Sequence, residues 1–470
     1  MKASIHLPDI LSTLDWAVFI GVLILTFLSV LYGHQKKAKQ QTESESVLDL
    51  LLMGRQLTLP LFVATLVATW YGGIFGVTRI AFEKGLYNFV TQGLFWYISY
   101  LLFALFLVKR IAPYKAVTLP DLIGKMFGPN SARLSAVFNF FNVLPIAYTI
   151  SLGLFTQMLF GGNLFLNMLL GLILVMLYSS WGGLRAVVYS DLIQFFVMCS
   201  SVLFVFVFSL MQFGGIDYLT MNLPAAHFEL TGGEGWLATF VWGFIALATL
   251  VDPNFYQRCF AADQERTARR GIYLSTIVWL CFDICTTAGA MYARAAIPEA
   301  ESAQAYLIYA LQLLPNGLRG FFLAGILATI LSTLDSYLFL AGTTLSYDLV
   351  PKKWRGNIRV HHLGILLVGI LSLFFAYVFE ANIKTVWKVL GSYFAACLLL
   401  PVLTGHLKPG FLRDRDFVTG SLTGVVAVSL WPFLKPENGL WALDTLYIGA
   451  LSTLLGLLTS RFILFRTRLA

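Results

Sequence analysis

The chain has 470 residues, of which 58% are hydrophobic and 12% are charged, and its mean hydropathy is +0.77. No soluble domain of this length has that balance, so the composition excludes a soluble protein and predicts an all-α polytopic membrane protein. The net charge of +8 would suit a nucleic-acid partner, but the distribution of the charges along the chain explains it without one.

About thirteen apolar runs have the length of a membrane-spanning helix, roughly 18 to 25 residues. In chain order the predicted spans are 16–33, 60–80, 86–108, 132–159, 164–181, 184–210, 236–256, 271–297, 317–347, 360–380, 383–404, 416–434 and 442–465.

The positive charges predict the orientation of these spans. The connections 34–59, 109–133 and 258–270 are rich in Lys and Arg, whereas the long connection 211–235 has none. With the N-terminus outside, three quarters of the 32 Lys and Arg residues fall on the cytoplasmic side. Because cytoplasmic loops carry the positive excess, we expect an N-out, C-in, multi-pass protein of the cell (inner) membrane.

Two of the predicted spans contain residues that interrupt a helix. The string ATWYGGIFG places Gly72 and Gly73 in the middle of one, and the string LVDPN places Asp252 and Pro253 in another, five spans later. Broken helices at matching positions of two five-span halves are typical of transporters built from inverted repeats, because unwound backbone can bind a cation where it lines a cavity. The alternative is that the two glycines only let neighbouring helices pack closely.

The predicted span 317–347 has a polar centre. Thr329, Ser332, Thr333 and Ser336 recur at the spacing that places side chains on one face of a helix. Polar groups at membrane depth are costly unless they bind something. This face offers only oxygen ligands at close spacing, which suits a small hard cation that has shed most of its water. We therefore predict that this helix forms half of a sodium site.

Four local strings resemble those of the sodium:solute symporter family. They are MGRQLTLPLFVATLVATWYGG, YSSWGGLRAVVYSDLIQ at 178–194, YQRCFAADQERTARRG at 256–271, and ILATILSTLDSYL. The resemblance implies a LeuT-type fold with two inverted five-span repeats in a single transporter domain, 1–470. The expected parts are an extra span with a cytoplasmic loop (1–59), the first repeat (60–210), the second repeat (236–404) and two extra spans (416–470).

The resemblance also implies a sodium site between the first and the eighth core helices. Its ligands map onto the backbone carbonyls of Ala68, Tyr71 and Thr329, and onto the hydroxyls of Ser332 and Thr333. The family usually has a smaller residue at the Thr329 position, a departure of little consequence where the backbone is the ligand.

Some members of the family bind a second sodium ion through the aspartate that matches Asp191. Here that site would consist of Asp191, Ser332, Asp335 and Ser336, and two carboxylates beside two cations would balance the charge. The alternative is that Asp191 caps a helix or pairs with Arg185 near the cytoplasmic face, and that Asp335 bonds to backbone.

The solute is expected near the midplane, between the two broken helices. The candidate contacts are Trp70, Phe75, Gln92, Asp252 and Asn254, with Tyr148 more remote. An indole face attracts a quaternary ammonium group and Asp252 would add a counter-charge, so these two residues favour an amine, unless Trp70 only packs in the core. Arg79 favours instead a solute with a carboxylate, which it would draw in as a gating residue, unless Arg79 only pairs with Glu83.

These observations predict a sodium-coupled secondary active symporter, not an enzyme, that imports a small polar organic solute by alternating access. Amines, zwitterions, organic acids and sugars stay open as solutes. The expected partners are sodium, the solute and the lipid bilayer, with no nucleic acid. Proton coupling through Asp191 or Asp335 is one alternative, and a transporter-like sensor is another. A further intramembrane acid, Asp283, is expected to bond to Thr286 and Thr287 or to relay protons.

Overall fold

The computed structural model describes residues 10–35, 43–179, 183–355, 357–435 and 443–466. Over these residues the chain is helical apart from turns and one isolated β-bridge, which confirms the all-helical architecture. Some predicted features include residues outside the described ranges, namely 1–9, 36–42, 180–182, 356, 436–442 and 467–470.

Ten helices of the described part are long and apolar enough to cross a membrane. Two shorter apolar helices, α3 (Leu59–Ala68) and the helix that covers Leu164–Leu177, accompany them. Length and composition do not test the number of crossings or their direction, so the thirteen spans and the N-out orientation stay predictions.

The N-terminal half begins with two helices that precede the first predicted repeat, α1 (Thr13–Gln35) and α2 (Glu43–Leu52). The helices that follow are α3, α4 (Ile74–Lys84), α5 (Leu86–Asn88), α6 (Phe95–Leu102), α7 (Val108–Ile111), α8 (Leu119–Met126), α9 (Pro129–Asn142), α10 (Ile146–Phe160), α11 (Leu164–Ser179) and α12 (Gly183–Phe213). Two π-helical stretches join α5, α6 and α7 into one continuous rod.

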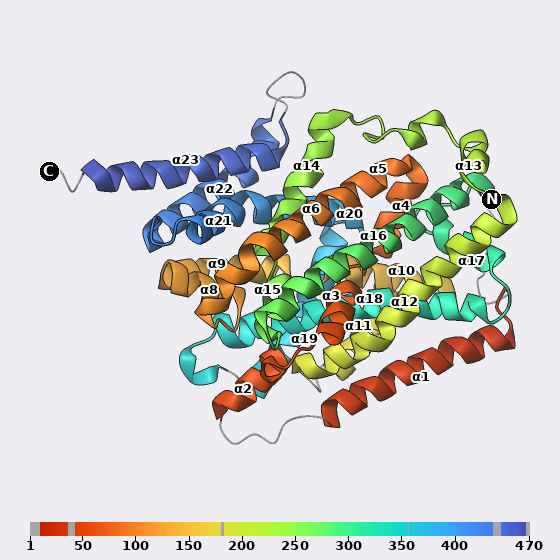
Figure 1. Ribbon diagram of the computed structural model, residues 1–470, viewed down its shortest axis with the longest axis horizontal. Helices are drawn as coiled ribbons and strands as arrows, with labels where there is room; N and C mark the ends of the chain where they lie inside the picture. Colours follow the sequence, from red (N-terminus) through yellow and green to blue (C-terminus); the bar gives the residue numbers. More distant parts are fainter. Residues whose placement is uncertain (1–9, 36–42, 180–182, 356, 436–442, 467–470) are drawn as a thin grey trace.

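The C-terminal half follows a connection that contains α13 (Ile216–Asn222). Its helices are α14 (Gly235–Leu247), α15 (Pro253–Ala261), α16 (Glu265–Ala296), α17 (Ala305–Leu313), α18 (Leu318–Thr343), α19 (Ile358–Val378), α20 (Ile383–Phe394), α21 (Leu400–Leu407), α22 (Asp414–Leu434) and α23 (Thr445–Arg466). The last two pack together on one side of the molecule, and α1 lies along the opposite side (Figure 1).

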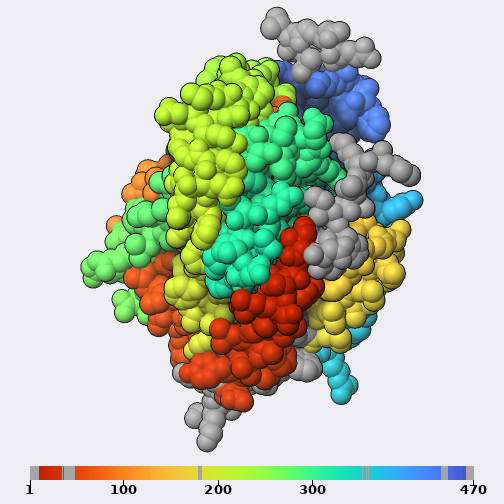
Figure 2. Space-filling model, turned by 90° about the vertical axis from the view of Figure 1, so that its right-hand side faces the viewer, coloured from red at the N-terminus to blue at the C-terminus, as the bar shows by residue number. Residues whose placement is uncertain are grey.

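The central helix of the bundle is α18, which carries the predicted polar stripe. Of its most apolar stretch, 94% is buried inside the protein. The helices α1, α10, α12 and α19 pack around it. Figure 2 shows α1, in red, on the outer surface, where it covers part of α12 and α18. The polar face of α18 is therefore shielded from the bilayer by other helices.

The first predicted break is confirmed, because the chain unwinds between α3 and α4. A Cβ atom on Gly73 would lie 2.0 Å from Cζ2 of Trp387, and one on Gly72 would lie 2.6 Å from Cβ of Thr333. Only glycine leaves room for these approaches. The glycines therefore do both things that were considered for them: the chain unwinds at this point, and α18 and α20 pack directly against the unwound backbone.

The second predicted break is also confirmed, between α14 and α15. Asp252 caps α15, and its Oδ1 accepts the N–H groups of Asn254 at 2.8 Å and Phe255 at 3.4 Å. Pro253 occupies the first helical position, where its missing N–H costs nothing. A third interruption was not predicted: the fourth predicted span divides into α9 and α10 at Pro145, because proline removes a helical donor and constrains the residue before it.

The isolated β-bridge, between Leu57 and Ala262, fastens the chain before α3 to the end of α15. The N–H of Leu57 donates to the carbonyl of Ala261 at 2.9 Å, and the N–H of Asp263 donates to that of Leu57 at 3.1 Å. The Arg55 guanidinium adds three hydrogen bonds of 3.0 to 3.2 Å to backbone carbonyls, those of Phe260, Lys115 and Ala116. The two broken helices are therefore tied together at one end.

Candidate functional site

The break between α3 and α4 leaves the last carbonyl of α3 without its helical donor. In a continuous helix the Ala68 carbonyl would accept the N–H of Gly72, but that N–H donates to Oγ1 of Thr333 at 2.8 Å. The Ala68 oxygen accepts instead the hydroxyls of Ser332, at 2.8 Å, and Thr333, at 3.3 Å. Two helices thus meet through oxygen atoms where the chain unwinds, and all three residues are buried.

Four of the five residues predicted to bind sodium come together here. The Thr329 carbonyl accepts the same two hydroxyls, of Ser332 at 3.2 Å and of Thr333 at 3.0 Å. Such carbonyl and hydroxyl oxygens are the ligands that a small hard cation prefers. Tyr71 is the exception. Its carbonyl belongs to the peptide whose N–H contacts Thr333, and in a trans peptide the carbonyl points to the opposite side.

A buried guanidinium lies where the second sodium ion was expected. Arg258 is fully buried in α15, although the charge pattern predicted a loop position for it. Its Nη2 donates to Oγ of Ser336 and to Oγ1 of Thr69, both at 2.8 Å. Thr65 links this group to Asp191, because its hydroxyl accepts from Arg258 at 3.4 Å and donates to Oδ2 of Asp191 at 2.5 Å.

The carboxylates of this region do not all have the expected partners. Arg185 forms an ion pair with Asp49 at 2.6 Å, so the alternative in which Arg185 pairs with Asp191 is wrong. Oδ1 of Asp191 is buried and has no hydrogen-bond partner among the described residues. Asp335 is buried as well, one residue before Ser336. Of the predicted second site, the structure brings Asp191 and Ser336 to one guanidinium.

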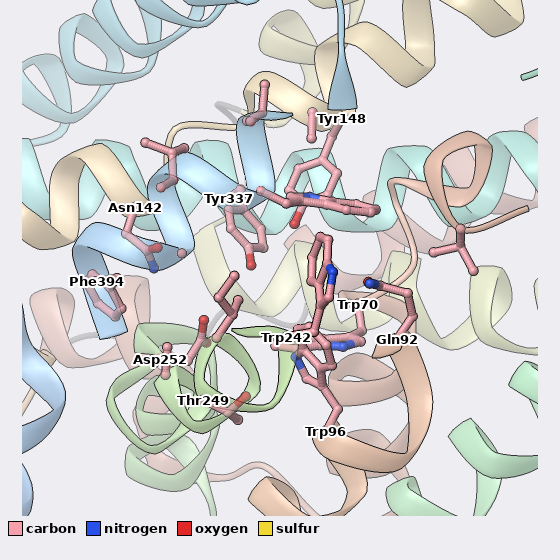
Figure 3. Close-up of a pocket in the computed structure, with 18 of the residues that line it drawn as sticks. Trp70, Gln92, Trp96, Asn142, Tyr148, Trp242, Thr249, Asp252, Tyr337 and Phe394 are labelled. Carbon is pink, nitrogen blue, oxygen red and sulfur yellow. The ribbon is translucent and has the colours of Figure 1, made fainter. Parts of the chain in front are cut away.

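A cavity of about 160 Å³ lies between the two broken helices. Three of the predicted solute contacts line it, Trp70, Gln92 and Asp252, and so does the more remote candidate Tyr148. Figure 3 shows aromatic rings that converge on the cavity from several helices, with Asp252 and Gln92 on opposite sides of the view. The cavity thus has a largely apolar wall rich in aromatic rings, with the carboxylate of Asp252 on one side and the amide of Gln92 on the other.

The other predicted contacts do not line this cavity. Phe75 is buried in the core, and Oδ1 of Asn254 accepts a hydrogen bond from Arg258 at 3.0 Å. Arg79 forms an ion pair with Glu83 at 2.8 Å and is half exposed, as the simpler of the two interpretations predicts. A cationic gate at Arg79 has no support from these contacts.

Several lining residues were missed by the sequence analysis. Trp96 follows Gln92 by one helical turn, so the face already assigned to the solute could have identified it. Trp242, Trp387 and Tyr337 lie on separate helices and carry no local signal.

Asp283 connects to the cavity through tyrosine. The hydroxyl of Tyr71, a lining residue, donates to Oδ1 of Asp283 at 2.5 Å, and Tyr97 donates to Oδ2. The carboxylate does not form the expected bonds to threonine, since the Thr286 hydroxyl donates to the backbone carbonyls of Phe282 and Asp283 and the Thr287 hydroxyl accepts from Asn88. Asp283 therefore holds the ring of Tyr71 in place beside the cavity.

Comparisons of the sequence with a family model and with known proteins agree, because both find sodium-coupled transporters. Residues 50–408 match the model of the Sodium:solute symporter family. The sodium/proline symporter 2 of Staphylococcus saprophyticus is 24% identical over 488 residues, which cover 96% of this chain and 93% of that protein. The sodium/glucose cotransporter of Vibrio parahaemolyticus is 25% identical, with 89% of this chain and 84% of that protein covered.

Solved structures show the same fold. A sodium-coupled sialic acid symporter in a substrate-bound, outward-open state has a TM-score of 0.76 at 16% identity, with 96% of this chain and 98% of that chain covered. A manganese transporter of Eremococcus coleocola has a TM-score of 0.55 at 12% identity, with 89% and 96% covered. At these identities the likeness concerns the fold alone.

Proposed function

Because this chain belongs to the sodium:solute symporter family and is therefore a sodium-coupled symporter of a small solute, we propose that its sodium ion binds where α18 crosses the break between α3 and α4. The observation that carries the proposal is the Ala68 carbonyl, which has lost its helical donor and accepts two hydroxyls of α18. A cation would take the place of the shared hydroxyl protons, because hydroxyl oxygens can turn their lone pairs toward it.

The proposed ligands are the carbonyls of Ala68 and Thr329 and the hydroxyls of Ser332 and Thr333, with the carbonyl of Tyr71 as the fifth. In the present geometry the Tyr71 carbonyl points away from Thr333. A rotation of this one peptide would turn the carbonyl toward the ion, and it would release the N–H that Thr333 accepts. Sodium binding would then exchange a hydrogen bond between α18 and the unwound backbone for coordination.

The same stretch of chain couples the ion to the solute. Trp70 lies between Ala68 and Tyr71 in the sequence, and both Trp70 and Tyr71 line the cavity. Sodium at Ala68 would fix the unwound backbone and with it the position of the Trp70 ring. By linkage, the solute must then strengthen sodium binding by the same factor.

The fold is LeuT-like, and the two helix breaks support the proposal that it consists of two inverted repeats, 60–210 and 236–404, within one transporter domain, 1–470. We propose that the protein lies N-out and C-in in the inner membrane and imports its solute by alternating access. One sodium ion that moves inward at 100 mV releases about 2.3 kcal/mol. At about 1.4 kcal/mol per factor of ten, this supports roughly 50-fold accumulation of the solute.

A second sodium ion on Asp191, Ser332, Asp335 and Ser336 is disfavoured by the contacts of Arg258. Its guanidinium already donates to Ser336 and lies across Thr65 from Asp191. A further cation there would be repelled by this charge, and the repulsion is strong at low dielectric constant. We therefore propose one sodium ion per transport cycle.

The test is the melting temperature of the purified protein in detergent, at constant pH and ionic strength, with sodium replacing potassium. A ligand at 100 times its Kd stabilises the native state by about 2.7 kcal/mol, so we expect a clear rise with sodium. A protein that ignores sodium and is stabilised by acid instead would refute the sodium site. That result would favour proton coupling through Asp191 or Asp335.

A further inference from the structure

Aromatic rings form a large part of the wall of the solute cavity, beside aliphatic side chains and a few polar ones. Four of the rings are indoles, one in the unwound stretch between α3 and α4 and the others on α6, α14 and α20, and phenol rings add to them. The rings used in this argument are those of Trp70, Trp96, Trp242, Trp387, Tyr148 and Tyr337. The face of an indole attracts a cation through its quadrupole, more strongly where water is excluded. Such a wall favours a solute with a positive group and a small apolar surface.

Asp252 is the only charged residue among those that line the cavity. Two backbone N–H groups of α15 hold its Oδ1 in place. Among the described residues no Lys or Arg forms an ion pair with it. The Arg258 guanidinium attracts this carboxylate only at longer range, and it donates hydrogen bonds to the hydroxyls of Thr69 and Ser336. The cavity thus presents a carboxylate that has no ion-pair partner of its own.

A carboxylate on the solute would find no basic partner in the same cavity. Arg79, which could have received one, is paired with Glu83 and half exposed. A buried charge without a partner is costly. The cavity therefore disfavours organic acids and zwitterions, while a neutral sugar would leave Asp252 without a counter-charge inside the cavity.

Gln92 adds a polar contact opposite the carboxylate. Its Nε2 is buried and has no hydrogen-bond partner among the described residues, and Figure 3 shows its amide directed toward the cavity. Buried amides are normally satisfied, so a polar group of the solute is expected here. The volume of about 160 Å³ limits its size, because a cavity of about 150 Å³ in another protein accepts benzene.

We propose that the solute is a small organic cation, an amine or quaternary ammonium compound that carries one oxygen function. Its cationic group lies among the indoles, within reach of Asp252, and its oxygen meets the amide of Gln92. This inference rests on the proposed symport function and names its substrate class.

The experiment titrates purified full-length protein in saturating sodium with choline, L-proline, acetate and D-glucose, at matched ionic strength. Binding is followed by the melting temperature and by the fluorescence of the lining indoles. We expect choline to bind at least tenfold more tightly than the other three. Asp252→Asn should weaken choline binding at least tenfold, because it removes the counter-charge. The cap of α15 should remain, because asparagine caps helices as well as aspartate does.

A matched control is Asp444→Asn. Asp444 also caps a helix, since its Oδ1 accepts the N–H of Leu446 at 3.1 Å, but it pairs with Lys388 and is not among the residues that line the cavity. This variant should bind choline like the wild type. Preference for L-proline, acetate or D-glucose over choline would overturn the proposal. So would an Asp252→Asn variant with wild-type choline affinity.

The sodium titration of the wild type separates this inference from the proposed function. A protein that responds to sodium but not to choline overturns the organic cation and leaves sodium symport standing. A protein that binds choline equally well without sodium supports the organic cation and contradicts the coupling.

Discussion

Removal of a single oxygen tests the sodium site most directly. Ser332→Ala deletes a hydroxyl that donates to the Ala68 carbonyl and to the Ala328 carbonyl of its own helix, both at 2.8 Å. An interaction with a charged group contributes about 1.5 to 3 kcal/mol. At about 1.4 kcal/mol per factor of ten, the variant should bind sodium about 10- to 150-fold more weakly.

The fold itself should tolerate this change. Alanine is the best helix former, the Ala328 carbonyl keeps its place in the helix, and the Ala68 carbonyl keeps the hydroxyl of Thr333 as a donor. Without sodium the variant should therefore melt close to the wild type, whereas its rise in melting temperature should require far more sodium. Titration of the melting temperature and of indole fluorescence in potassium buffer, with ionic strength held constant, measures both quantities.

Ser372→Ala is the matched control for this experiment. Ser372 is equally buried, and its hydroxyl donates to a carbonyl of its own helix, that of Val368, at 2.8 Å, but it lies on α19. It should leave the sodium affinity unchanged. The reasoning is refuted if Ser332→Ala binds sodium like the wild type, or if both variants lose affinity equally.

Three other substitutions have expected outcomes. Gly73→Ala should destabilise the protein by about 1 to 3 kcal/mol, because its methyl would lie 2.0 Å from the Trp387 ring; an unchanged melting temperature would contradict the packing. Thr329→Val should weaken sodium binding far less than Ser332→Ala does, since the Thr329 hydroxyl donates only to its own helix. The same sodium titration of the melting temperature measures the difference. Arg258→Met should lower the free energy of unfolding by about 3 to 5 kcal/mol, because it leaves the buried carboxylate of Asp191 without its neighbouring cation. A variant as stable to heat as the wild type would show that the charge of Arg258 is not needed.

The features that the sequence predicts well are those that depend on neighbouring residues. The oxygens of Ser332 and Thr333 follow from helical spacing, and the breaks follow from a glycine pair and from Asp252 before Pro253. Each of these signals lies within a few residues, where backbone preference decides the outcome.

The wall of the cavity and the charge cluster depend on contacts between distant segments. Trp242 and Trp387 are two indoles in a chain that is 15% aromatic, and no local feature distinguishes them from rings that face lipid. Arg258 resembles a loop charge because it begins a basic run. Its burial is possible because hydroxyls at the C-terminal end of α3 and on α18 accept its hydrogen bonds, and the convergence of those helices is a property of the whole fold.

The bridge between Leu57 and Ala262 bears on leakage. Together with Arg55 it contributes two backbone hydrogen bonds and one guanidinium hydrogen bond between the chain before α3 and the end of α15. At about 0.5 to 1.5 kcal/mol each, opening this end would cost roughly 1.5 to 4.5 kcal/mol. An empty carrier would then adopt the open state in about one molecule in ten at the lower cost and about one in a thousand at the higher. Because backbone groups make two of these bonds, side-chain substitutions at the bridge do not remove them. A rarely opened empty carrier would let little sodium cross without solute, so the bridge would limit dissipation of the ion gradient.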